Sequence, residues 1–339
     1  AYGIQPSGRS RNCRPIVTVT LAFAQTLVVL AVGLALLVKG AGVAVDRLVS
    51  LARRFGVSDD LVGMTVVALG TSLPELASHV VASVGIVSGT LDYEVTSATV
   101  LGGNMGSSTL QQFLLVGVLL LGYGRYRPTL TFLRTSYVPM LVAFAVTLAL
   151  GWDGSVTRLD GLVLLVVYVG YLVAGVRARD RSHPLPSTDG DATVRRDALV
   201  AALGLVGVLV GATVILRTTE VLIATLRLGG SMVGVITLGV AAAIPEFATV
   251  VESIRRRTPA LALGTLVGSN VVNPLVGIGL GAVISTYAVP YPVLVWDLPV
   301  KLLVGVGLLA VAWLFRERQL TRSEGFALVV CYFGYLTGR

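Results

Sequence analysis

In the stretch "VVALGTSLPELASHVV", residues 66–81, a proline and a glutamate, Glu75, interrupt a run that is otherwise apolar. A second stretch, "GVAAAIPEFATVV" at residues 239–251, repeats the same pair of residue types and places Glu246 after its proline. An acidic side chain inside an apolar segment is costly to bury and usually serves a function. The two Pro-Glu pairs are therefore the first candidates for a functional site.

The composition around these stretches is that of a polytopic membrane protein. Of the 339 residues, 55% are hydrophobic and only 13% are charged. A helix needs roughly 20 apolar residues to cross the hydrocarbon layer. Runs of suitable length predict ten spans, at 17–39, 60–82, 96–121, 129–150, 158–176, 198–216, 230–252, 261–282, 296–315 and 324–338.

The arginines between these spans predict the orientation of the chain in the cell membrane. Most of them lie in the odd-numbered loops, and Arg-rich short loops stay in the cytoplasm. We therefore expect both termini to lie outside and the polar stretch 177–197 to be a flexible cytoplasmic linker. Arg9, Arg11 and Arg14 are an exception, because this orientation places them outside.

The two Pro-Glu stretches belong to an internal repeat. Each is followed by a second motif, "LGGNMGSSTLQQFLLVG" at 101–117 or "LGTLVGSNVVNPLVGIG" at 263–279. By the span count the two copies enter the membrane from opposite sides, and inverted repeats around a midplane site are typical of secondary transporters. The predicted fold is an all-α membrane protein of ten transmembrane helices in two inverted five-helix repeats. Its parts are an N-terminal extension (1–16), a first repeat (17–176, motif 67–117), the linker (177–197) and a second repeat (198–339, motif 236–279).

A proline inside a helix leaves the carbonyl one turn earlier without a partner, here the carbonyls of Gly70 and Ala241. Such a carbonyl is costly in a bilayer unless protein, water or an ion satisfies it. Carbonyl and carboxylate oxygens are the ligands of hard cations such as Ca²⁺, and two glutamates balance its charge. Glu75 and Glu246 are thus predicted to bind a divalent cation.

The second motif supplies neutral oxygens to the same pocket. Ser107 and Gln111 are four residues apart, as are Ser269 and Asn273, so each pair projects from one helical face. Small residues let such a helix approach its partner closely. The glycines expected to do so are Gly102, Gly103, Gly106, Gly264 and Gly268.

These motifs resemble those of the cation/Ca²⁺ antiporter superfamily, and most closely the prokaryotic sodium/calcium exchangers. The similarity rests on "ALGTSLPELA" with "GSSTLQQ" and on "AAIPEFA" with "LGTLVGSNVVN", and it covers nearly the whole chain. It implies an exchange of Na⁺ for Ca²⁺ by alternating access at a central site. The ion-binding positions that it implies are Thr71, Ser72, Glu75, Ser107 and Gln111 in the first repeat, and Ala242, Ala243, Glu246, Ser269 and Asn273 in the second.

The chain departs from this family pattern at several places, among them Gln111, which stands where an asparagine is usual, and two that bear on the driving ion. The second repeat has Ala242 and Ala243 where hydroxyl side chains are usual, so the divalent site looks intact while the sodium sites look depleted. His79 lies one turn after Glu75 and replaces a small polar residue. Since histidine titrates near neutral pH, His79 could favour proton coupling, or it could simply lie nearer the helix end and bond to a neighbour. Proton/calcium or other divalent cation antiport is therefore the alternative to sodium/calcium exchange.

Other classes of function fit the sequence less well. No nucleophile or histidine cluster accompanies the two acids, so an enzyme is not expected. A channel would need a continuous pore with a filter, and a primary pump would need a phosphate-binding loop. We expect no cofactor, no nucleic-acid partner and function as a monomer in the lipid bilayer, with Ca²⁺ and Na⁺ (or H⁺) as substrates.

Overall fold

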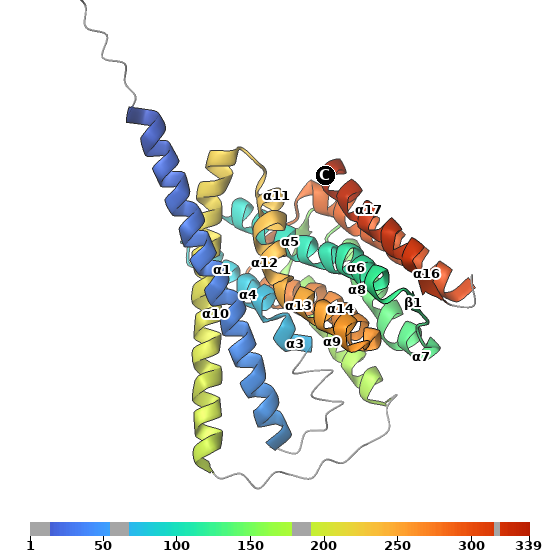
Figure 1. Cartoon of the computed structure of the whole chain (residues 1–339). Coiled ribbons are helices and arrows are strands. Elements are labelled where there is room, and N and C mark those ends of the chain that lie inside the picture. Colours follow the sequence, from blue (N-terminus) through green and yellow to red (C-terminus); the bar gives the residue numbers. More distant parts are fainter. Residues whose placement is uncertain (1–13, 55–67, 178–190, 315–318) are drawn as a thin grey trace, which may run out of the picture.

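The computed structural model describes residues 14–54, 68–177, 191–314 and 319–339, and these residues are mostly helical (Figure 1). The described residues of the first half form eight α-helices that are joined by π-helical turns, labelled η, and by two short strands. In order they are α1 (Arg14–Arg54), α3 (Ala68–Thr71), α4 (Leu73–Val87), α5 (Tyr93–Thr109), η2 (Leu110–Leu115), α6 (Val116–Tyr123), β1 (Arg125–Tyr126), α7 (Leu130–Phe132), η3 (Leu133–Tyr137), α8 (Val138–Leu150), β2 (Ser155–Val156) and α9 (Arg158–Arg177).

The second half repeats this order of elements. It consists of α10 (Asp191–Leu226), α11 (Gly230–Gly234), η4 (Val235–Gly239), α12 (Val240–Ala242), α13 (Ile244–Arg256), α14 (Pro259–Val272), η5 (Asn273–Ile278), α15 (Gly279–Ile284), β3 (Tyr287–Ala288), η6 (Val293–Asp297), α16 (Leu298–Leu314), β4 (Leu320–Thr321) and α17 (Arg322–Gly338).

The described residues contain seven helices that are long and apolar enough to cross a membrane. The bent pair 230–242 and 244–256 brings this number to eight. Of the two remaining predicted spans, 60–82 lies partly outside the described residues and continues into the shorter apolar helix α4, and 324–338 lies in the 17-residue helix α17. The chain is therefore a multi-pass membrane protein, while the number ten stays a prediction.

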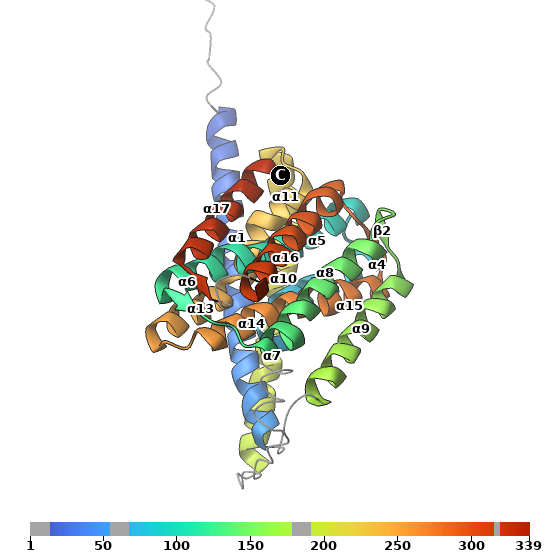
Figure 2. The same cartoon turned by 90° about the vertical axis from the view of Figure 1, so that its right-hand side faces the viewer.

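Helices α1 and α10 lie side by side along one flank of the bundle (Figure 1). They touch through small residues: a Cβ added to Gly40 would lie 2.7 Å from the carbonyl oxygen of Gly204, and one added to Gly211 would lie 2.6 Å from the backbone nitrogen of Leu37. Backbones that approach this closely gain van der Waals contact, which drives helix association in lipid. The remaining helices pack beside this pair, as the view turned by 90° shows (Figure 2).

Within the bundle, equivalent elements of the two halves exchange partners. Helix α4 packs on η5 and α15, and its counterpart α13 packs on η2 and α6. In the same way α9 packs on α15 and α17 packs on α6. The short strands follow this rule, since β1 pairs with β4 and β2 pairs with β3. The two halves thus contribute matching surfaces to the centre of the bundle.

These contacts bring together loops that were predicted to lie on one side of the membrane. Strands β1 and β4 both belong to odd-numbered loops, and β2 and β3 both belong to even-numbered loops. Near the end of α1, Arg47 and Arg54 bind Asp197 of α10 with N···O distances of 3.1 and 3.2 Å. Which of the two sides faces the cytoplasm stays a prediction.

The predicted linker 177–197 is shorter in the structure. Residue 177 ends α9 and α10 begins at Asp191, so residues 191–197 are helical rather than flexible. The two arginines of α1 and the Ser50 hydroxyl, 3.2 Å from Oδ2, hold Asp197 in place, which explains why the helix extends this far. The part between, 178–190, lies outside the described residues.

The glycine prediction is confirmed for α5 but not for all of α14. A Cβ on Gly102 would lie 2.1 Å from the carbonyl oxygen of Ser231, and one on Gly106 would lie 2.7 Å from Cα of Val235, so α5 crosses α11 and η4 at backbone contact. By contrast, a Cβ on Gly264 would meet no atom within 4 Å. Gly264 was therefore wrongly predicted to be a packing residue, because it is exposed on the outer side of α14.

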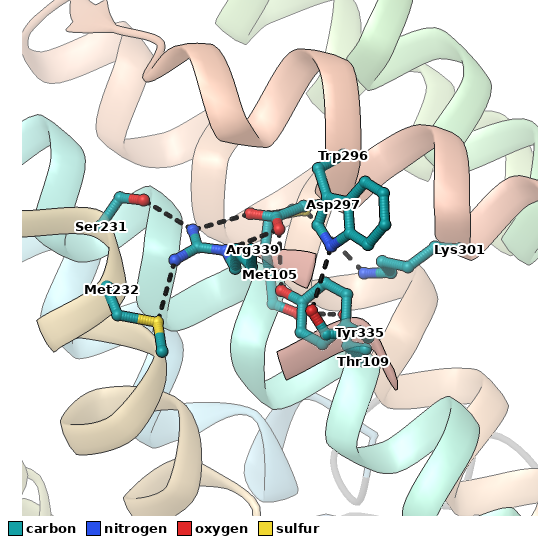
Figure 3. Close-up of polar contacts among 9 residues, drawn as sticks. All are labelled: Met105, Thr109, Ser231, Met232, Trp296, Asp297, Lys301, Tyr335 and Arg339. Atoms are coloured by element: carbon teal, nitrogen blue, oxygen red, sulfur yellow. Dashed lines mark hydrogen bonds and ion pairs between the residues drawn. The ribbon is translucent and has the colours of Figure 1, made fainter. Parts of the chain in front are cut away.

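A buried ionic cluster joins η6, α11 and α17 (Figure 3). Asp297 accepts from Arg339 at both carboxylate oxygens, with N···O distances of 2.7 and 2.9 Å, and from the Tyr335 hydroxyl at 2.8 Å. Arg339 also donates to the Ser231 hydroxyl at 2.6 Å. Lys301, one turn after Asp297 and fully buried, has its Nζ 3.9 Å from the sulfur of Met105. Neither the arginine nor this carboxylate was singled out by the sequence patterns.

Candidate ion-binding site

Both Pro-Glu helices are broken immediately before the proline. The break lies at Ser72 (φ −89°, ψ 4°) in the first half and at Ala243 (φ −82°, ψ −3°) in the second. In the second half the two pieces are bent by 46°. Each proline falls in the first turn of the new helix, where its missing N–H is tolerated. The predicted interruption is therefore present in both repeats, with nearly the same backbone angles.

The break places Glu75 and Glu246 in the first turn of α4 and of α13. The N-terminus of a helix carries unpaired N–H groups and a partial positive charge, which favours a carboxylate. The side chains are 4% and 0% exposed, so both acids are buried in the centre of the bundle. Sequence and backbone together thus explain how the protein holds two carboxylates at this depth.

Glu75 is held by residues from both halves of the chain. Its Oε1 accepts from the Ser107 hydroxyl at 2.7 Å and from Nδ2 of Asn273 at 3.0 Å. Gln111 donates from Nε2 to the Ser107 oxygen at 3.1 Å, as the four-residue spacing predicts. Two of the predicted site residues of α5 and η2 therefore meet Glu75 directly or through one bond.

Glu246 has the equivalent arrangement. Its Oε1 accepts from the Ser269 hydroxyl at 3.0 Å, and the Ser269 oxygen lies 2.8 Å from that of Ser72. Since Ser72 belongs to the first repeat, Glu246 is linked to the other half through Ser269, whereas Glu75 is bonded directly to Asn273 of the other half. The structure thus brings Ser72, Ser107, Gln111, Ser269 and Asn273 together around the two acids.

The other candidates lie at the same junctions. Thr71 is half-buried and ends α3, and Ala242 and Ala243 are buried between α12 and α13. The methyl side chains of Ala242 and Ala243 offer no oxygen, so these two residues can bind an ion only through their backbone carbonyls. The role of each of these ten residues as a ligand stays a prediction.

The polar atoms that are left over at the site are oxygens. Oε2 of Glu75, Oε2 of Glu246 and Oδ1 of Asn273 are buried and have no hydrogen-bond partner among the described residues. A buried polar atom without a partner costs roughly 1–3 kcal/mol, and more if it is charged. Unpaired oxygens of carboxylates and amides are the donor set of a hard cation. The arrangement therefore fits a cation better than an anion or an apolar ligand.

His79 is not near the end of its helix. It is 1% exposed in the middle of α4, with Nδ1 3.1 Å from the Tyr287 hydroxyl and Nε2 3.0 Å from Nδ2 of Asn104. Of the structural interpretation of His79, the bonding to neighbours is confirmed and the position near the helix end is wrong. Its part in proton coupling stays a prediction. Its burial follows from the packing of α4 on η5 and α15.

Two buried amides beside the site were missed. Asn270 donates to Oε1 of Gln111 at 2.9 Å, and Asn104 donates to the backbone oxygen of Asn273 at 2.8 Å. Both amides lie within the second motifs, among glycines and aliphatic residues. An amide in such surroundings could have indicated a functional role, but the four-residue spacing from the serine does not include it.

Comparison with known proteins agrees with this geometry. The family model for sodium/calcium exchanger protein matches residues 25–176 and 197–339. The chain is 27% identical to the putative antiporter CaxA of Alkalimonas amylolytica, over 90% of this chain and 95% of that protein. It is 23% identical to the sodium/calcium exchanger MaX1 of Methanosarcina acetivorans, over 91% of this chain and 96% of that protein.

The fold is also similar to that of the solved sodium-calcium exchanger NCX_Mj. The TM-score is 0.61 at 21% identity, with 92% of this chain and 98% of that chain covered. Both repeats, with their Pro-Glu helices and their second motifs, fall within the matched residues. The chain therefore belongs to the sodium/calcium exchanger protein family.

Proposed function

We propose that the protein is a secondary antiporter, not an enzyme, that exchanges Na⁺ for Ca²⁺ at a central site built on Glu75 and Glu246. The observation that carries this proposal is the pair of buried carboxylates, each with one oxygen free of hydrogen bonds and each in the first turn of a broken helix. Two carboxylates balance the charge of Ca²⁺ in a site of low dielectric constant. MaX1 and NCX_Mj carry the name of sodium/calcium exchangers, which supports the same ion pair here.

The exchange of partners between the halves supports a mechanism of alternating access. In inverted-repeat transporters one bundle moves against the other around a fixed site. Here α1 and α10 touch through glycines on one flank. Glu75 is bonded to Asn273 of the other half, and Glu246 is linked to Ser72 of the other half through Ser269. We infer ten spans in two inverted repeats, 17–176 and 198–339, with both termini outside and the linker in the cytoplasm. We also infer that the α1–α10 pair moves along the remaining helices during transport.

Proton coupling is the alternative driving reaction, because the second repeat lacks the hydroxyls of Thr71 and Ser72. His79 is a poor carrier for it. Asn104 presents a donor to Nε2, so this nitrogen accepts and the ring carries its hydrogen on Nδ1. A second proton on the ring would have to bind Nε2, which would remove the buried hydrogen bond between Nε2 and Asn104. Any proton coupling would therefore use the two glutamates.

Countertransport in liposomes tests the proposal. Purified protein is reconstituted, loaded with an internal Na⁺ solution and diluted into ⁴⁵Ca²⁺, with a matched sample that has the same Na⁺ on both sides. An antiporter accumulates ⁴⁵Ca²⁺ against its gradient only in the first sample. Equal accumulation without an ion gradient, or flux that stops when Ca²⁺ is equal on both sides, would indicate a channel instead.

A further inference from the structure

Asn104 of α5 has an orientation that its neighbours determine. Its Nδ2 donates to the backbone oxygen of Asn273 at 2.8 Å and to Nε2 of His79 at 3.0 Å, so both amide hydrogens are used. A flipped amide would place two oxygens against each other at Asn273. The side chain is 2% exposed, and its Oδ1 has no hydrogen-bond partner among the described residues. The structure therefore holds one carbonyl oxygen in a fixed place without a donor.

This oxygen belongs to a side chain that lines a small cavity beside Glu75. The cavity measures about 10 Å³, and its wall includes Glu75, Ser78, Asn104 and Ala242. This volume is close to what one water molecule or one ion of similar size requires. The wall also includes the aliphatic Val100 and Leu238. The Glu75 side chain carries the unpartnered Oε2, and Ser78 donates its hydrogen to the oxygen of Pro74 at 2.7 Å, which leaves the lone pairs of its hydroxyl available.

The charge of this donor set suits a monovalent cation. One carboxylate and two neutral oxygens carry a total charge of −1, whereas Ca²⁺ takes six to eight oxygens and commonly more than one carboxylate. Ala242 stands where the first repeat has Thr71, four residues before the glutamate, so the second repeat brings no hydroxyl to this cavity.

We propose that Asn104 Oδ1 and Glu75 Oε2 are ligands of a Na⁺ site on the Ala242 side of the two glutamates, where the amide takes the place of the missing hydroxyl. This inference rests on the proposed sodium/calcium exchange. It also gives His79 a task, because the contact of its Nε2 with Nδ2 of Asn104 fixes the orientation of the amide. Gly277 leaves the room for this pair, since a Cβ there would lie 3.1 Å from Cδ2 of His79 and 3.2 Å from Nδ2 of Asn104.

The site has no counterpart in the second repeat. The position three residues before Ser269, equivalent to Asn104, is Leu266. The sodium sites of this chain are therefore asymmetric, with oxygen ligands restored on one side by a residue outside the motif positions.

Binding of ²²Na⁺ and of ⁴⁵Ca²⁺ to the purified full chain tests the assignment, by scintillation proximity in detergent. The test variant is Asn104→Leu, which has a similar size and no oxygen. The matched control is Ser97→Ala, because Ser97 lies on the same helix, is fully buried and has an unpartnered hydroxyl. We expect the Kd for Na⁺ to rise about tenfold or more in Asn104→Leu, as for the loss of one partner of a charged group. The Kd for Ca²⁺ and both values for the control stay within about threefold, below that expected loss.

A second variant keeps the test decisive if Asn104→Leu does not fold. Ala242→Thr adds a hydroxyl to the cavity, so it is expected to tighten Na⁺ binding in the wild-type background and to restore it in Asn104→Leu. An unchanged Kd for Na⁺ in Asn104→Leu, an equal loss of Na⁺ and Ca²⁺ binding, or no gain in Ala242→Thr overturns the assignment.

Transport measurements separate this inference from the proposed function. If a Na⁺ gradient drives Ca²⁺ transport by the wild-type protein, and the Kd for Na⁺ is the same in Asn104→Leu, only the inference is wrong. If Na⁺ binding depends on Asn104 but no Na⁺-driven Ca²⁺ flux occurs, the Na⁺ site stands and the proposed exchange is wrong.

Discussion

Replacing Asp297 with asparagine should destabilise the protein more than any single change to its partners. Asp297 is fully buried and neutralises Arg339, whose side chain is 1% exposed, through two hydrogen bonds of 2.7 and 2.9 Å. Breaking a buried pair from one side costs about 3–5 kcal/mol, because the other charge stays buried without a partner. Asp297→Asn leaves the buried guanidinium of Arg339 without its countercharge, so its cost should fall within this range.

The reverse change should be milder. Arg339→Gln removes the paired charge but leaves Asp297 with the Tyr335 hydroxyl as a donor. The loss is then of the order of one charged hydrogen-bond pair, about 1.5–3 kcal/mol. The double variant, Asp297→Asn with Arg339→Gln, no longer buries the unpaired guanidinium of Arg339. Its free energy of unfolding should therefore exceed that of Asp297→Asn alone.

Unfolding by SDS in mixed micelles measures these differences. Trp296 donates from Nε1 to the backbone oxygen of Tyr335 at 3.1 Å, so its fluorescence reports on the cluster itself. A cost below about 1 kcal/mol for Asp297→Asn would refute the reasoning, because that is the size of an exposed pair. A larger loss in Arg339→Gln than in Asp297→Asn would refute the role given to the Tyr335 hydroxyl.

Three further predictions concern the site, the helix crossing and the linker. Glu75→Gln and Glu246→Gln should each abolish ⁴⁵Ca²⁺ transport in folded protein, because half of the charge that balances the ion is lost; transport near the wild-type rate by either variant would exclude the two-glutamate site. Gly234→Ala should cost roughly 1–3 kcal/mol in SDS unfolding because its Cβ would lie 2.1 Å from a backbone oxygen of α5, whereas the matched Gly264→Ala should be neutral; equal effects would contradict the crossing. Proteolysis within 178–190 should leave exchange intact, and its loss with both halves still associated would show that the linker takes part in transport.

The general plan of this membrane protein could be predicted because each part of it depends on local sequence. The apolar runs predict the helices, and the prolines predict where α4 and α13 begin. The four-residue spacing of Ser107 and Gln111 places them on one face, and the structure joins them by a hydrogen bond. Helix lengths were less predictable: α1 and α10 extend beyond their apolar runs because they pack on each other, and Asp197 is paired across their ends.

The contacts between the halves could not be predicted, because they depend on how distant segments meet. Asn273 lies 198 residues from Glu75 and nevertheless binds it, whereas the four-residue spacing placed Asn273 only on the same helical face as Ser269. Asn104 lies on another helix and contacts Nε2 of His79, and the sequence around His79 gives no indication of this contact. The cluster of Asp297 and Arg339 joins helices whose sequences carry no motif. Small strands such as β2 and β3 are two residues long, too short for a periodic signal.

The driving ion for calcium movement tests the central claim most directly. Proteoliposomes loaded with ⁴⁵Ca²⁺ are exposed first to an inward Na⁺ gradient at equal pH, and then to an inward proton gradient without Na⁺, with Glu75→Gln vesicles as the control in each case. The account predicts rapid Ca²⁺ efflux with the Na⁺ gradient, little with the proton gradient and none in the variant. Efflux that is driven by the proton gradient alone would contradict sodium/calcium exchange and make the protein a proton/calcium antiporter.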